Sequence, residues 1–398
     1  GPALMHAGLV LEALEEMARG SLNSEVSNAS ENPPSLGRGI LFGLKKGGKL
    51  TEKTRKAEVL VIGAGPGGYT AAIRLGQYGL NPLVVEQENV GGVCLNWGCI
   101  PTKTLYSTTE PLSRLESWQK KGIEVSRIDV NRGKMVDHKD RVVKKLTGGV
   151  EKLIEAGGGE IIKGKAEINS RSEVVVRRTD GKKVHIEPET VILATGSSPI
   201  ELPGFPYEKE AVWNSRDAVK LSEVPDKLVI LGAGVIGLEM GTIYCRLGSE
   251  VKILEMADSL LPGMNLDRRF ESLLSRELKK SGLEIHTGTR AGELIEKSGR
   301  YVVTGETGSG TQEFEADRVL SAVGRSPVSS PVAAKLGLEV DDSGFIEIDE
   351  GCRTSRDGVY AVGDVAGPPL LAHKAARQGL IAAAEVAGKA SSDYKTVP

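Results

Sequence analysis

The chain is poor in several features that mark other classes of protein. Among 398 residues there are 4 cysteines and 5 histidines, aromatic residues make up 4%, and no apolar run is long enough to span a membrane. So few cysteines argue against a secreted, disulfide-stapled domain, and we expect the protein in the reducing cytoplasm. We also expect no metal site, because His6, His138, His185 and His286 lack Cys or acidic neighbours at ligand spacing.

An excess of charge of either sign is also missing. The 51 basic and 53 acidic residues leave a net charge of -2. This balance offers no basic surface for nucleic acid and no polybasic membrane anchor, so we expect small molecules or other proteins as partners, including self-association.

Residues 1–56 differ in composition from the rest. Apolar and acidic residues alternate over 4–17 as in a short amphipathic helix, and 21–39 is rich in Ser, Asn, Pro and Gly like a linker. One hypothesis is that this helix docks on exposed surface of the chain or on a partner protein. The alternative is a flexible extension.

Glycine, in contrast, is abundant, with 50 residues, and part of it falls in a recognisable pattern. An apolar strand beginning at Ala57 runs into Gly63, Gly65 and Gly68, a helix of small residues follows, and the next strand ends in Glu86. Such glycines permit a tight turn and close approach of a pyrophosphate to the helix N-terminus, while the acid accepts hydrogen bonds from a ribose. The unit predicts a bound dinucleotide.

The same design occurs a second time. The strand Lys227 to Leu231 precedes Gly232, Gly234 and Gly237. Glu255 follows Gly237 by 18 positions (255 − 237), as Glu86 follows Gly68 (86 − 68). One such glycine pattern could be an ordinary turn, but two copies with strand, helix and acid predict two dinucleotide sites.

A pair of cysteines lies just after the first pattern. Cys94 and Cys99 flank the residues 95–98 within Gly-Gly-Val-Cys-Leu-Asn-Trp-Gly-Cys-Ile-Pro-Thr-Lys at 91–103. Beside a nucleotide site, this spacing suits a disulfide that exchanges electrons with a cofactor. The alternative is two buried cysteines without a redox role. Cys245 and Cys352 lack partners at useful spacing and fit small packed residues better.

Taken together, these features resemble the pyridine nucleotide–disulfide oxidoreductases, and among them the dihydrolipoamide dehydrogenases. The resemblance covers about residues 57–390. It also rests on four further motifs: Val-Ile-Leu-Ala-Thr-Gly at 191–196, Ala-Val-Gly-Arg-Ser-Pro at 322–327, Thr-Ser-Arg-Asp-Gly-Val-Tyr-Ala-Val-Gly-Asp at 354–364 and Leu-Ala-His-Lys-Ala at 371–375.

The resemblance assigns cofactor roles. It implies that FAD is held by Gly63, Gly65, Gly68, Glu86 and Asp364, and NAD by Gly232, Gly234, Gly237 and Glu255. It adds Gly92, Thr195, Gly196, Gly324, Arg325 and Gly363 to the cofactor-binding residues. After Glu255 come Met256, Ala257 and Asp258, without the Arg or Lys that would neutralise a 2′-phosphate, so NAD is favoured over NADP.

The resemblance also implies the catalytic groups. Cys99 would be the thiolate against the flavin, near the start of a helix at about Ile100, and Cys94 the thiol that exchanges with substrate. Lys103 and Glu239 would form an ion pair beside the flavin. The alternative is a solvated surface charge at Lys103 and an exposed helical acid at Glu239. His373 lies in a family motif near the flavin edge, where a structural role is at least as well supported as a catalytic one.

The implied reaction passes electrons between dihydrolipoyl groups, free or on a lipoyl domain, the Cys94–Cys99 disulfide, FAD and NAD. One alternative is an NADH-dependent reductase of another disulfide. The family also has a C-terminal interface domain that supplies a His–Glu base, and this sequence contains no such pair after His373. The second alternative is therefore a lipoyl-protein-binding flavoprotein whose partner supplies that base.

We therefore expect an α/β protein with two doubly wound, Rossmann-like nucleotide-binding domains. The FAD domain would be discontinuous, over 57–205 and 325–390, with the NAD domain inserted at 206–324. Residues 1–56 would form an extension and 391–398 a tail.

Overall fold

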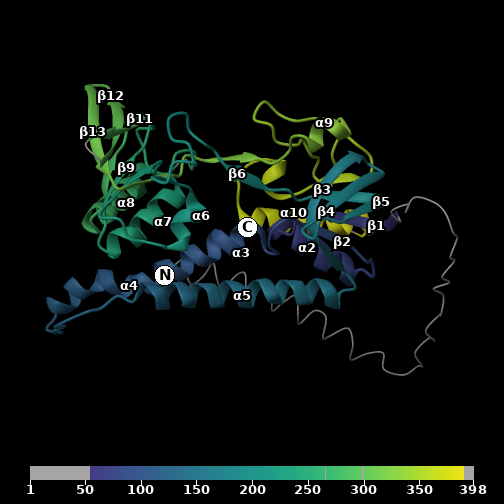
Figure 1. The fold of residues 1–398 in the computed structure, drawn as a ribbon, viewed down its shortest axis with the longest axis horizontal. Helices are drawn as coiled ribbons and strands as arrows, with labels where there is room; N and C mark the ends of the chain where they lie inside the picture. The colour runs from purple at the N-terminus through teal and green to yellow at the C-terminus, as the bar shows by residue number, and fades with distance from the viewer. Residues whose placement is uncertain (1–53, 265, 298–299, 390–398) are drawn as a thin grey trace.

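The computed structural model describes residues 54–264, 266–297 and 300–389 (Figure 1). The helix predicted over 4–17 and the tail 391–398 lie outside the described residues. Within them, the chain forms two separate groups of strands, with the first group completed by residues from near the end of the chain.

The first group is centred on strand β1 (Arg55–Ile62). Its neighbours in a parallel sheet are β2 (Leu83–Glu86) and β5 (Lys183–Leu193), with β3 (Glu160–Ser170) beyond β2 and β16 (Val359–Ala361) beyond β5. Strand β4 (Glu173–Arg178) pairs antiparallel with the remaining parts of β3 and β5. The two long strands thus belong to a parallel sheet and to an antiparallel one.

Both faces of β1 are covered, which explains its continuous apolar run. Val59 and Val61 pack with helices α2 (Pro66–Gln77), α5 (Arg132–Ala156) and α10 (Ala372–Val386). Leu60 and Ile62 point the other way and pack with β4 and helix α9 (Val332–Leu336). Strand β1 begins at Arg55, two residues before the predicted start at Ala57, so Arg55 and Lys56 belong to the sheet.

The second group contains a five-stranded parallel sheet. Its order is β10 (Glu284–His286), β9 (Glu250–Leu254), β8 (Lys227–Leu231), β14 (Arg318–Ser321), β7 (Val212–Trp213). Helices α6 (Ser215–Lys220), α7 (Val235–Arg246) and α8 (Arg268–Lys280) accompany it. A three-stranded antiparallel sheet, β11 (Arg290–Lys297), β12 (Arg300–Thr307) and β13 (Gly310–Ala316), packs against it through Phe314 and Val303.

The chain passes between the two groups through a short two-stranded ribbon. Strand β6 (Ser197–Pro199) leaves the first group and β15 (Arg325–Pro327) returns to it, and the two pair antiparallel. This arrangement confirms the predicted α/β class with two Rossmann-like sheets. The domain limits given above stay predictions.

Helices α3 (Gly92–Trp97), α4 (Cys99–Gln119) and α5 link the two groups, and Figure 1 shows α5 running beneath both and α4 beneath the second group. A 3-10 turn, η1 (Gly363–Ala366), precedes α10. Among the described residues, none of the helices is both long and apolar enough to cross a membrane.

Candidate functional site

The first glycine pattern forms the predicted turn between β1 and α2. Gly63 has a φ of +100°, and a Cβ there would lie 2.3 Å from the carbonyl oxygen of Ala194. A Cβ on Gly68 would lie 1.9 Å from the carbonyl oxygen of Gly63. These positions therefore admit no larger residue. The carboxylate of Glu86 is buried and accepts hydrogen bonds from the backbone N–H of Ala64 at 2.7 Å and of Glu88 at 2.8 Å.

The second pattern repeats this turn between β8 and α7. Gly232 has a φ of +101°, and a Cβ on Gly237 would lie 2.1 Å from the carbonyl oxygen of Gly232. Buried Glu255 accepts hydrogen bonds at 2.7 Å from the backbone N–H of Ala233 and of Ala257. A carboxylate has about four lone-pair directions, so Glu86 and Glu255 keep acceptor capacity for a ribose hydroxyl.

The middle glycine of each pattern faces open space. Gly65 and Gly234 are the N-caps of α2 and α7, with a φ of -73° that any residue adopts and no side-chain cap on the helix. A Cβ on Gly234 would meet nothing within 4 Å, and one on Gly65 would come no closer than 4.0 Å to the backbone of Gly92. Uncapped helix N-termini with free approach are suited to the pyrophosphates of FAD and NAD.

The two cysteines are joined as a disulfide, with their Cα atoms 4.7 Å apart. Cys94 lies on α3 and is 8% exposed, while exposed Cys99 is the first residue of α4. Gly92, just before Cys94, has a φ of +57°, and a Cβ there would lie 2.6 Å from the Cα of Gly65. The disulfide segment therefore lies directly against the first glycine turn.

Lys103 and Glu239 meet in the structure. The ammonium group of Lys103, one turn into α4, forms an ion pair with the carboxylate of Glu239 on α7, and the two side chains are 22% and 26% exposed. The pair links the redox helix to the helix of the second glycine turn. The two residues are thus partners across the two groups of strands and not separate surface charges.

The remaining predicted cofactor residues gather where the chain crosses between the groups. Gly196 and Gly324 have φ values of +72° and +130°. The Thr195 hydroxyl donates to the carbonyl oxygen of Val328 at 2.6 Å. Arg325 donates to the Ser197 hydroxyl oxygen at 2.7 Å, and that hydroxyl donates to Asp364 at 2.6 Å. Ser197, which our sequence analysis did not single out, thus connects Arg325 to Asp364.

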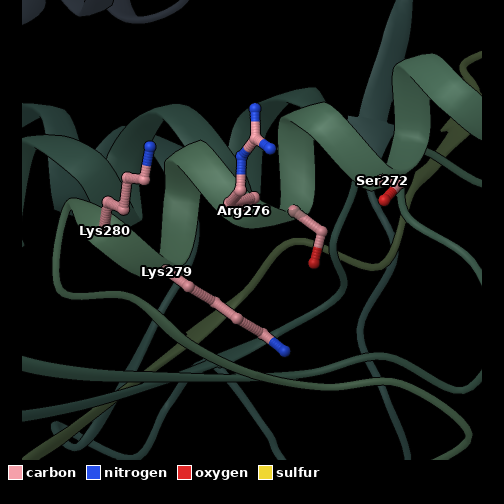
Figure 2. Close-up of a pocket in the computed structure, with 5 residues that line it drawn as sticks. Ser272, Arg276, Lys279 and Lys280 are labelled. Atoms are coloured by element: carbon pink, nitrogen blue, oxygen red, sulfur yellow. The ribbon is translucent and has the colours of Figure 1, made fainter.

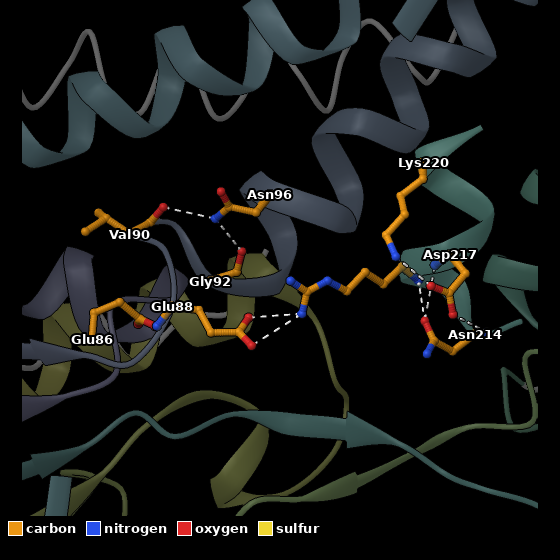
Figure 3. A network of polar contacts seen from close by, with 9 residues as sticks. Glu86, Glu88, Val90, Gly92, Asn96, Asn214, Asp217 and Lys220 are labelled. Atoms are coloured by element: carbon orange, nitrogen blue, oxygen red, sulfur yellow. Dashed lines mark hydrogen bonds and ion pairs between the residues drawn. The ribbon is translucent and has the colours of Figure 1, made fainter. Parts of the chain in front are cut away.

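A second contact that the sequence did not reveal ties the redox segment to helix α6. The guanidinium of Arg216 lies 4.0 Å from the ring centre of Trp97, which ends α3 between the two cysteines. Arg216 also forms an ion pair, at 3.1 Å, with Glu88, two residues after Glu86 of the first glycine turn (Figure 3). The Asn214 side chain caps α6 and holds its first turn, including the backbone of Arg216.

We expect Arg216→Ala to change the environment of Trp97 more than the stability of the protein. An exposed ion pair and a partly exposed cation–π contact together contribute about 1 kcal/mol. Trp97 fluorescence and its quenching by acrylamide would report the change, with Trp97→Phe identifying its share of the signal. Lys220→Ala on the same helix, which loses a pair with Asp217, is the matched control. Unchanged quenching in Arg216→Ala would contradict the contact.

Other features of the described residues are separate from this site. Figure 2 shows a surface hollow whose lining residues all lie on α8, among them Ser272, Arg276 and Lys279.

Burial raises the pKa of Cys352 to about 12 and also raises that of Cys245, so both thiols are poor nucleophiles, in line with a packing role. The described residues hold no group of three or more potential metal ligands.

Comparison with known proteins gives a consistent result. The model of the pyridine nucleotide-disulphide oxidoreductase family matches residues 57–379. A dihydrolipoyl dehydrogenase of Haloferax volcanii is 41% identical over 347 residues, which cover 86% of this chain and 72% of that protein. One from Thermus scotoductus is 43% identical over 337 residues, covering 83% and 71%.

Solved structures share the fold. The HOCl-induced flavoprotein disulfide reductase RclA from Escherichia coli superposes with a TM-score of 0.71 at 26% identity, over 84% of this chain and 73% of that one. LpdA from Mycobacterium tuberculosis gives 0.75 at 23% identity, over 85% and 74%, which shows the fold alone. With two dinucleotide turns, a disulfide against the first of them and this family match, the chain belongs to the pyridine nucleotide-disulphide oxidoreductases.

Proposed function

We propose that the chain is a dihydrolipoamide dehydrogenase-like enzyme that uses FAD and NAD. It would transfer two electrons between dihydrolipoyl groups and NAD through the Cys94–Cys99 disulfide and FAD. The observation that carries this proposal is the placement of the disulfide segment against the first glycine turn, where Gly92 meets Gly65. The 41% identity to a dihydrolipoyl dehydrogenase supports the choice of substrate.

Each cofactor has a matching set of residues. FAD would be held by the turn of Gly63, Gly65 and Gly68, by Glu86 and by Asp364. The other residues that the resemblance adds to the cofactor-binding set are Gly92, Thr195, Gly196, Gly324, Arg325 and Gly363. When bound, FAD supplies a two-electron carrier between a dithiol and a nicotinamide. The turn of Gly232, Gly234 and Gly237 with Glu255 would hold NAD.

The chain's own chemistry is a thiol–disulfide exchange. One substrate thiolate attacks the sulfur of Cys94, which forms a mixed disulfide and releases Cys99 as a thiolate. The second substrate thiolate attacks the mixed disulfide, which releases the lipoyl disulfide and leaves both cysteines reduced. In the net reaction the substrate dithiol gives up two electrons and two protons. The two electrons would pass through bound FAD to NAD⁺, which would accept them with one proton as a hydride, and the other proton would pass to solvent.

Two features of the chain would support these steps. Cys99 is the first residue of α4, where the unpaired N–H groups and the dipole of the helix favour a thiolate. The Lys103–Glu239 pair would keep a positive charge close to the flavin and hold α4 against α7. The sequence after Glu255 continues to support NAD over NADP, and the low cysteine content supports the cytoplasm as the place of action.

The test is anaerobic NADH oxidation by the FAD-loaded protein, with lipoamide as acceptor in one assay and an artificial dye in a parallel assay. We expect turnover with both. Dye reduction without lipoamide reduction would overturn the proposal of a self-sufficient enzyme. Adding a lipoyl-domain protein, or screening other disulfides, would then separate a missing partner from a different substrate.

A further inference from the structure

Helix α10 carries a buried lysine that the reaction above does not use. Lys374 is 7% exposed, and its ammonium group donates to the carbonyl oxygen of Gly363 at 3.2 Å and to that of Gly367. Within the part of the chain that the structure describes, it forms no ion pair with a carboxylate within 4.0 Å. A buried ammonium whose hydrogen-bond acceptors are both backbone carbonyls is costly, because no carboxylate neutralises it by direct contact. Such a residue therefore points to a role beyond packing.

The two carbonyls belong to the turn that presents Asp364. Gly363 is the first residue of η1 and Gly367 the residue after its end, so a single ammonium group holds both ends of the turn. The side-chain oxygen of Gln378, one helical turn further along α10, accepts a hydrogen bond from the backbone N–H of Gly363 at 2.8 Å. Gln378 and Lys374 of α10 thus fix the amide and the carbonyl of Gly363, the glycine before Asp364. Gly363 has a φ of +82°.

The electrostatics fit the same role. Burial lowers the pKa of Lys374, and the nearby negative charge of Asp364 raises it. Asp364 is held on another side by the Ser197 hydroxyl, to which half-buried Arg325 donates. The carboxylate therefore lies between buried Lys374, which holds the backbone turn, and Arg325, which is connected to it through Ser197.

Helix α10 also contacts the other half of the proposed FAD site, as Figure 1 shows for α10 beside α2. A Cβ on Gly379 would lie 2.4 Å from the carbonyl oxygen of Gly67 in the first turn of α2. A Cβ on Gly67 would in turn lie 3.3 Å from the carbonyl oxygen of Ala375. Helix α10 thereby fixes the position of the pyrophosphate-binding end of α2 relative to the turn that carries Asp364.

We propose that Lys374 is a positioning residue for FAD, which holds the η1 turn so that Asp364 and the N-terminus of α2 engage the cofactor together. This inference rests on the FAD site proposed above. It does not depend on which disulfide the enzyme reduces.

The test measures FAD binding to the apoprotein from the change in flavin fluorescence. Lys374→Met keeps the length of the side chain and removes the charge and its hydrogen bonds. We expect it to raise the FAD dissociation constant about tenfold, because the buried carbonyls of the η1 turn lose their hydrogen-bond donor and the turn is no longer held. Lys335→Met, which removes an exposed lysine on α9, should leave the FAD dissociation constant unchanged. NADH binding to the same apoproteins shows whether the rest of the chain is folded.

A double-mutant cycle separates positioning from general stability. If Lys374 acts through Asp364, Lys374→Met should weaken FAD binding little further in an Asp364→Ala background. Losses that multiply in the double variant, or an unchanged dissociation constant in Lys374→Met, would overturn the proposal. If Lys374→Met also loses NADH binding, the variant is misfolded and Gln378→Leu replaces it in the test. Gln378→Leu should also raise the FAD dissociation constant, and an unchanged FAD dissociation constant would overturn the role of the turn.

Discussion

The Cys99→Ser variant is expected to lose disulfide turnover by at least about a thousandfold while it keeps NADH-dependent dye reduction. Loss of a covalent nucleophile or of its partner removes the exchange pathway altogether, which is why such losses are large. Dye reduction needs the two nucleotide sites and not the disulfide, so it reports that the variant folds and binds its cofactors. Parallel assays with lipoamide and dye measure both. Equal loss of lipoamide and dye reduction would contradict the claim that the disulfide is needed only for reaction with the disulfide substrate.

The Cys94→Ser variant should lose turnover to the same extent, yet the two thiols should differ in their response to FAD. In the described structure Cys99 is exposed and Cys94 is 8% exposed. If Cys99 lies against the flavin, FAD should slow alkylation of Cys99 in Cys94→Ser and leave alkylation of Cys94 in Cys99→Ser unchanged. Peptide mapping separates these from the two other cysteines. If FAD instead slows alkylation of Cys94, then Cys94 would be the thiol against the flavin and Cys99 the one that exchanges with substrate.

The second large effect concerns the two middle glycines. Gly65→Ala should lower FAD affinity, and Gly234→Ala should lower NADH affinity with FAD retained. The added methyl group meets little or nothing in the protein and instead enters the space for the pyrophosphate. Overpacking of this kind costs about 1–3 kcal/mol, roughly tenfold to a hundredfold in a dissociation constant. Titrations of FAD into apoprotein and of NADH into FAD-loaded protein measure the two effects.

The stability of the same variants provides the control. Both glycines have a φ of -73°, which alanine adopts without strain. Because the preference for glycine over alanine at a helix N-cap opposes the entropic gain of about 0.4–1 kcal/mol, replacing them should leave the stability of the apoprotein nearly unchanged. Gly148→Ala on α5, where a Cβ also meets nothing within 4 Å, should stabilise the protein without touching either affinity. Parent-like NADH affinity in Gly234→Ala would show that the nucleotide does not lie on this turn.

Much of the site was predictable because its parts are local in sequence. The strand, glycine turn, helix and acid of each nucleotide unit lie within a short stretch, and the chemistry of each residue follows from its place in that stretch. The spacing of Cys94 and Cys99 likewise brings them within disulfide reach on adjoining helices. Contacts such as Arg216 with Trp97 were not predictable, because they join residues far apart in sequence and Arg216 belongs to none of the motifs.

By itself the sequence determined the α/β class, the two glycine turns with Glu86 and Glu255, and the redox character of the cysteine pair. Tertiary structure alone decided that Gly92 rests on Gly65 and that Lys374 and Gln378 support the Asp364 turn. It also decided between the Lys103–Glu239 pair that the resemblance implied and two separate charges. The physical reason is that patterns of side chains encode local backbone geometry and burial. Which distant groups then meet depends on how the sheets, and the helices packed on them, are placed in space.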